Sequence, residues 1–75
     1  MDFILEFEQE TDGRWIAEIP ELSGVMAYGT TRMQAGEKVK ALALRVLADK
    51  MESENAMPII NHIAFSIHNE PVAVS

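Results

Sequence analysis

The sequence contains no cysteine, so neither a disulfide bond nor a thiolate-bound metal can stabilise the chain. Long hydrophobic runs are missing as well: no apolar stretch approaches the ~20 residues of a membrane-spanning helix, and the N-terminal residues lack the basic start of a secretory signal. Because a chain without cysteine also suits a reducing compartment, these absences predict a cytoplasmic protein with no membrane partner.

Basic residues are scarce: six Lys and Arg stand against twelve Asp and Glu, which gives a net charge of -6. Such a chain repels the phosphate backbone of nucleic acids, so we expect no direct nucleic-acid binding by this chain alone and favour a basic protein partner. The hydrophobic fraction of 48% is typical of a globular protein rather than of a disordered one.

The chain is also short, with 75 residues. A domain of this size buries only roughly 60% of the surface that its unfolded chain exposes. Without disulfides or metals, such a domain commonly gains stability by associating with other chains. We therefore expect one domain over residues 1–75, without a C-terminal DNA-binding domain, that forms a homo-oligomer of two or more copies.

Two segments near the N-terminus predict a β-hairpin, because apolar and polar residues alternate over residues 3–8 and again over 14–19. An Asp-Gly pair between them predicts the turn. A two-residue loop would place Glu18 opposite Phe7, on the core face, whereas a three-residue loop with its glycine left-handed pairs Phe7 with Ala17. We prefer the three-residue loop, because it keeps the apolar side chains on one face.

The rest of the chain predicts a short strand, a helix and a final strand. Turn-forming residues 20–24 end the second strand, residues 25–28 make a third, and Gly29 breaks it. Pro58 forbids continuation of the helix, and alternation over residues 59–68 predicts the last strand. A right-handed crossover would return this strand parallel to the first one.

The helix is expected to begin at about Arg32. Thr31 and Gln34 fit a capping box, in which the Thr31 hydroxyl accepts the Gln34 amide proton while the Gln34 side chain reaches back. Spacings of four, three and four residues place four apolar side chains on one narrow stripe, which is the expected core face: Ala35, Val39, Leu42 and Val46.

These elements predict one α+β domain with the order β-β-β-α-β, a mixed four-stranded sheet and one helix packed on one face. The other face of the sheet then has nothing within this chain to cover it. Three of its six side chains are acidic, and two of the others are isoleucines: Ile4, Glu6, Glu8, Arg14, Ile16 and Glu18.

The second strand, the loop after it and the start of the helix resemble the HicB-like antitoxin domain. The shared pattern is an aromatic residue and Ala in the strand, then Pro-x-Leu-x-Gly, a Gly before the helix and a small residue in its first turn. The resemblance covers roughly residues 3–48 and rests on Trp15, Ala17, Pro20, Leu22, Gly24, Gly29, Thr31 and Ala35.

This resemblance implies a fold similar to a truncated ribonuclease H sheet. It also implies the antitoxin half of a type II toxin-antitoxin pair, since members commonly neutralise HicA, a small basic mRNA-cleaving ribonuclease, by covering its active surface. A stand-alone oligomeric domain without a toxin is the alternative, and a ribonuclease H-like nuclease is a more distant one.

The residues favour an enzymatically inert chain without metal or other cofactor. Glu6, Glu8 and Glu18 could lie near one another across the first two strands, but exposed carboxylates without an inward-pointing acid do not fix a metal. His62 and His68 lie six residues apart on one strand. That separation is about 20 Å, too far to share a metal.

Two surfaces are candidate interfaces. The uncovered sheet face suits a basic toxin, because it combines negative charge with an apolar centre; its candidate contact residues are Ile4, Glu6, Glu8, Ile16 and Glu18. A second apolar stripe on the helix, roughly opposite the expected core face, suits self-association. Its candidate residues are Leu44, Leu47 and Met51.

Overall fold

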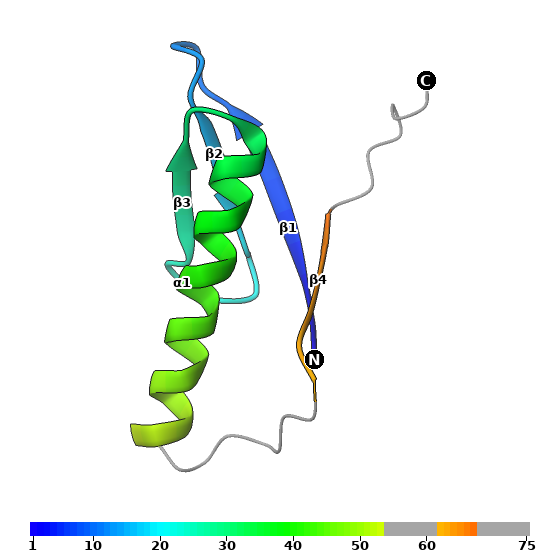
Figure 1. The fold of residues 1–75 in the computed structure, drawn as a ribbon, viewed down its shortest axis with the longest axis vertical. Helices are drawn as coiled ribbons and strands as arrows, with labels where there is room; N and C mark the ends of the chain where they lie inside the picture. The colour runs from blue at the N-terminus through cyan, green and yellow to red at the C-terminus, as the bar shows by residue number, and fades with distance from the viewer. Residues whose placement is uncertain (54–61, 68–75) are drawn as a thin grey trace.

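The computed structural model describes residues 1–53 and 62–67, and it confirms the predicted α+β architecture. Four strands form one sheet in the order β3-β2-β1-β4, and α1 packs on one face of it (Figure 1). The predicted strand residues 59–61 and 68 lie outside the described residues. The elements are β1 (Asp2–Gln9), β2 (Trp15–Glu18), β3 (Met26–Gly29), α1 (Arg32–Ser53) and β4 (Ala64–Ile67).

The hairpin between β1 and β2 has the predicted register. The two strands pair antiparallel with Phe7 beside Ala17, which leaves three residues in the loop. Gly13 adopts the expected left-handed conformation, with φ of 96°, and its N–H donates to the Glu10 carbonyl over 2.9 Å. The side chains of Phe7 and Ala17 therefore both lie on the face covered by α1.

The loop between β2 and β3 folds back on the end of β2 through three backbone hydrogen bonds. The Leu22 N–H donates to the Ile19 carbonyl over 3.0 Å, and the Val25 N–H donates to the Leu22 carbonyl over 3.1 Å. The Ile19 N–H in turn donates to the Val25 carbonyl. Gly24 supplies the positive φ of 80° that the turn needs, and the half-buried Leu22 packs against the core.

The start of α1 is capped almost as predicted. The Gln34 N–H donates to the Thr31 hydroxyl over 3.0 Å, which confirms the first half of the capping box. The Gln34 side chain does reach back, but its Oε1 accepts from the Thr30 N–H, 2.6 Å away, rather than from Thr31. Gly29 also differs from the prediction: it is the last residue of β3 and does not break the strand.

The buried face of α1 differs from the expected stripe. Leu42 and Val46 are only half-buried, whereas Leu47 is 3% exposed and belongs to the core. Positions four residues apart form a row that is inclined to the helix axis, and this row faces the sheet. The fully buried helix residues are Ala35, Gly36, Val39, Ala43 and Leu47.

The last described strand returns beside the first, as the crossover rule predicts. β4 pairs parallel with β1, with Phe3 beside Phe65, and their ring centroids lie 6.1 Å apart. Because α1 lies mainly over β3 and β2, it leaves β1 and β4 less covered (Figure 1). Within residues 1–53 and 62–67, no helix is both long and apolar enough to cross a membrane.

Candidate functional site

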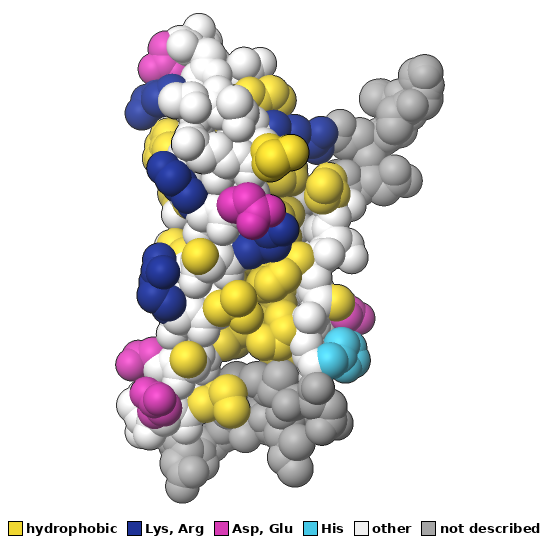
Figure 2. All heavy atoms as spheres, in the orientation of Figure 1, with side chains coloured by type: hydrophobic (Ala, Val, Ile, Leu, Met, Phe, Trp, Pro, Cys, Tyr) yellow, Lys and Arg dark blue, Asp and Glu magenta, His cyan; other side chains and the backbone are white. Residues whose placement is uncertain are grey.

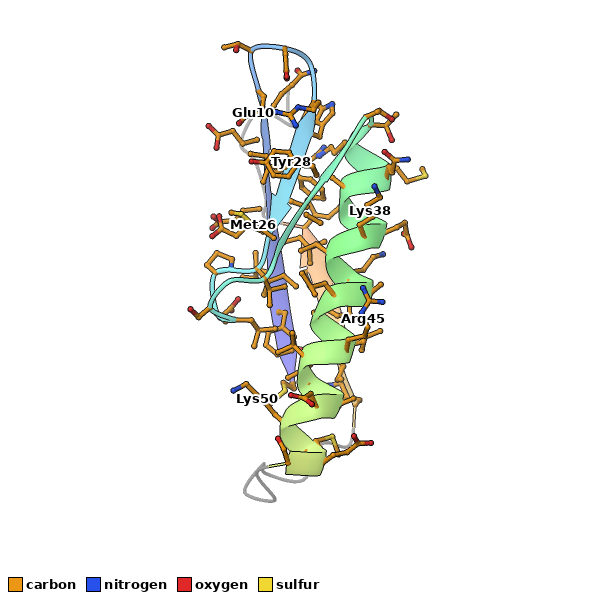
Figure 3. The ribbon with its side chains drawn as sticks, turned by 90° about the vertical axis from the view of Figure 1, so that its left-hand side faces the viewer. Glu10, Met26, Tyr28, Lys38, Arg45 and Lys50 are labelled. Carbon is orange, nitrogen blue, oxygen red and sulfur yellow. The ribbon has the colours of Figure 1, made fainter. Side chains whose placement is uncertain are left out.

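The sheet face turned away from α1 is the candidate site, called here the open face. Strand alternation places its side chains, and Figure 3 shows Met26 and Tyr28 projecting from the sheet on the side opposite the helix. The structure thus brings together the predicted residues of β1 and β2 and adds two from β3. The open face consists of Ile4, Glu6, Glu8, Arg14, Ile16, Glu18, Met26 and Tyr28.

Three carboxylates are gathered on β1 and β2. Glu6 lies directly opposite Glu18, and Glu8 lies opposite Ile16. All three glutamates are exposed, and with Ile16 and Phe7 they line a shallow depression of about 90 Å³. Like charges directly opposite each other destabilise a sheet. The chain therefore maintains negative charge here at some cost to its own stability.

An apolar strip runs beside these carboxylates. Ile16 is half-buried between Glu8 on β1 and Tyr28 on β3. Met26 and Tyr28, next to it, are each 43% exposed, whereas Ile4, which is 42% exposed, lies on the other side of the Glu6–Glu18 pair. Such clustered apolar side chains are the kind of surface that a protein partner covers. Sequence reasoning identified the third strand but missed its contribution, although Met26 and Tyr28 alternate with residues that face the core.

The one basic side chain of the open face is already paired. Arg14 Nε lies 3.0 Å from Asp12 Oδ2, and its guanidinium stacks 4.8 Å from the centre of the Tyr28 ring. The Arg14 backbone N–H also donates to Asp12, and this hydrogen bond holds the pKa of the Asp12 carboxyl below its ordinary value, with help from the guanidinium charge. Arg14 thus pairs with Asp12, and within residues 1–53 and 62–67 no ion pair compensates the charge of the three glutamates.

The residues that carry the HicB-like resemblance lie elsewhere, in positions that build the fold. Ala17 and Ala35 are fully buried, Gly24 supplies a positive φ, and Thr31 caps the helix. A Cβ on Gly29 would lie 2.5 Å from the Ala35 nitrogen. None of the motif residues belongs to the open face. The set also includes Trp15, Pro20 and Leu22.

The predicted oligomer stripe on α1 is wrong in one of its three residues. Leu47 is buried in the core, because the inclined row of α1 turns it toward the sheet. Leu44 and Met51 remain exposed, at 47% and 48%. Because Leu47 is not on the surface, Leu44 and Met51 do not form a continuous apolar stripe.

A second hollow lies between α1 and β4. It has a volume of about 470 Å³, and Figure 2 shows hydrophobic side chains along the boundary between the helix and the strand. Gly36 keeps the hollow open on the helix side, and the ion pair of Lys40 with Glu37, at 3.0 Å, crosses its rim. The apolar lining consists of Leu5, Phe7, Met33, Phe65 and Ile67.

The histidines and carboxylates of the described residues form no metal centre. Within residues 1–53 and 62–67, no group of three or more potential ligands comes together. His62 is exposed, and its Nε2 lies 3.8 Å from Asp2 Oδ1, whereas His68 lies outside the described residues.

Comparison of the chain with models of protein families, with curated proteins and with solved structures finds no match. The fold and the open face therefore carry the functional argument, together with the motif resemblance.

Proposed function

We propose that this chain is an antitoxin-like binding domain whose open face covers and neutralises a small basic HicA-type mRNA-cleaving toxin. The observation that carries the proposal is the set of three exposed, uncompensated glutamates beside an apolar strip. The proposal gives Glu6, Glu8 and Glu18 a docking role and no catalytic one.

The two components of the open face contribute in different ways. Exposed carboxylates attract a basic partner over a distance and accelerate association, and salt weakens this attraction. The apolar strip of Ile16, Met26 and Tyr28, and Ile4 beyond the glutamate pair, supply surface that is removed from water once the partner is bound. Charge thus governs the rate of encounter, and apolar burial slows dissociation.

The resemblance of residues 3–48 to HicB-like domains supports the same proposal, because members of that family commonly neutralise such toxins. A toxin that cleaves mRNA acts in the cytoplasm, so the proposal places this chain there as well. We also propose that the domain self-associates and that it does not bind nucleic acid by itself.

Charge reversal tests the proposal. The variant Glu6→Lys/Glu18→Lys replaces two opposed glutamates with two opposed lysines, so the repulsion across the strands persists while the open face changes sign. With a small basic HicA-type toxin as the partner, we expect the variant to bind at least about tenfold more weakly than the parent and to lose protection in an mRNA-cleavage assay.

The matched control is Asp49→Lys/Glu52→Lys, which makes the same change in net charge on exposed positions of α1. This control should neutralise the toxin as well as the parent does. If both variants lost toxin binding equally, the change in net charge alone would explain the effect. If both variants neutralised the toxin as well as the parent, the docking role would be refuted. A genomic neighbourhood without a small basic protein would favour the stand-alone oligomer instead.

A further inference from the structure

One edge of the sheet has backbone groups that no described strand pairs. β4 is the end strand beside β1. The Ala64 N–H donates to the Met1 carbonyl over 2.9 Å, so Ala64 and, two residues on, Ser66 direct their backbone groups toward β1. By the same alternation, Phe65 and Ile67 present their N–H and C=O groups to the outer side.

Apart from being short, this edge lacks the features that normally prevent strands from pairing. Edge strands are usually protected by short length, charged side chains, proline or a bulge. Residues 64–67 contain no charged residue and no proline, and Ile67 is 59% exposed on the apolar side of the strand. The hollow beside α1 adjoins the same two large side chains, Phe65 and Ile67.

The opposite edge of the sheet is different. Figure 3 looks onto the side of the molecule where β3 lies, and there Lys38 and Arg45 stand along α1 near that edge. Two copies that met through β3 would bring these cations toward each other, and like charges repel. The described β4 strand itself carries no charge, and the cations that line the hollow beside it, Arg32 and Lys40, lie there together with the acidic Glu37.

We propose that β4 pairs antiparallel with β4 of a second copy of this chain, with Ser66 on the two-fold axis. In this register the outward backbone groups of Phe65 exchange hydrogen bonds with those of Ile67 in the second copy. The large side chains then lie opposite each other on one face, and the serines meet on the other. The short strand is thus complementary to itself, which selects a second copy over an unrelated peptide.

The resulting dimer has one continuous eight-stranded sheet. A two-fold axis perpendicular to the sheet places both helices on the same side and both open faces on the other. The inference does not rest on toxin binding, because it uses only the β4 edge. It moves the self-association surface from the helix stripe to the strand.

A single cysteine tests this geometry, since the chain contains none. Ser66 is exposed, and the proposed pair across the axis is of the closely spaced kind, with Cα atoms about 4.5 Å apart. That distance is within the range of roughly 4.4–6.8 Å that a disulfide spans. We expect Ser66→Cys to form a covalent dimer on mild oxidation, whereas Met26→Cys, on the opposite edge strand, stays monomeric in the same gel.

Amide exchange and sedimentation give independent measurements on the full chain. We expect the Phe65 and Ile67 amides to be protected at high concentration and to lose protection on dilution, together with dissociation of the dimer. Ile67→Lys should sediment as a monomer, and Leu44→Lys, an equally drastic change at a comparably exposed position of α1, should not.

Several results would overturn the proposal. Ser66→Cys could cross-link no better than Met26→Cys, or the chain could sediment as a monomer throughout the concentration range. An associated form in which the Phe65 and Ile67 amides exchange freely would show that another surface joins the copies. A toxin that binds normally in any of these cases would leave the proposed function intact.

Discussion

Two glycines set how closely α1 approaches the sheet. A Cβ on Gly29 would lie 2.5 Å from the backbone nitrogen of Ala35, whereas a Cβ on Gly36 would meet side chains, the end of the Phe7 ring at 3.2 Å and Leu5 Cδ2 at 4.0 Å. Backbone cannot move aside without shifting the helix start, but a side-chain ring can turn by a small amount. The two glycines should therefore respond differently to the same added methyl group.

We predict that Gly29→Ala lowers the free energy of unfolding by about 2 kcal/mol or more, because the new methyl group overpacks the junction of β3 with α1. Gly36→Ala should change it by less than about 1 kcal/mol, since alanine gains roughly that much helix propensity and offsets the contact with Phe7. Urea unfolding of both variants measures the difference. Equal stabilities would show that the junction is looser than the structure indicates.

Asp12 provides a prediction on pH. Its pKa is lowered chiefly by the backbone N–H of Arg14. A carboxyl with a lowered pKa in the folded state stabilises the hairpin above its unfolded pKa, and this stabilisation is lost as the pH falls through the folded value. An NMR titration should give Asp12 a lower pKa in the parent than in an unfolded peptide of residues 9–16. Coinciding titration curves would refute the hydrogen-bonded turn.

The elements were predictable where a local rule and the apolar pattern agree. The three-residue hairpin loop follows from keeping Phe7 and Ala17 on one face, and the start of α1 follows from the cap formed by Thr31. The burial of Leu47 could not be predicted in this way. It depends on which row of α1 faces the sheet, and that is decided by the docking angle of two elements rather than by spacing within one.

The open face shows the same limit. The residues of β1 and β2 could be placed because their alternation is long and regular. Met26 and Tyr28 could not be placed with equal ease, because β3 has only four residues and its facing depends on pairing with β2. The local sequence pattern thus predicts the strands well. To predict which residues share one face of the sheet, the pairing register between the strands must also be known.

The corrected helix face leads to a prediction about α1. Leu47→Ala should cost about 2–5 kcal/mol, because it opens a cavity in the core. Leu44→Ala should cost well under about 1 kcal/mol, since surface substitutions away from special features rarely exceed ±0.5 kcal/mol. Thermal or urea unfolding compares the two. If Leu44→Ala lowered the free energy of unfolding by more than this, Leu44 would be buried between copies, as the predicted oligomer stripe on α1 requires.

The whole molecule is divided by charge. Of the twelve acidic residues, seven lie within residues 1–31, whereas five of the six basic residues lie on α1. The sheet side is therefore the negative side, and the helix side carries most of the positive charge. This distribution would orient the proposed basic partner toward the open face before contact, where the apolar strip also lies.

Isoleucine methyl groups report on this central claim most directly, because they lie on different parts of the molecule. Ile4 and Ile16 are on the open face, Ile19 is fully buried, and Ile67 is at the β4 edge. During titration with the basic toxin, methyl NMR should show Ile4 and Ile16 shifting to a bound position while Ile19 and Ile67 change little. Toxin binding that leaves Ile4 and Ile16 unmoved would contradict the account.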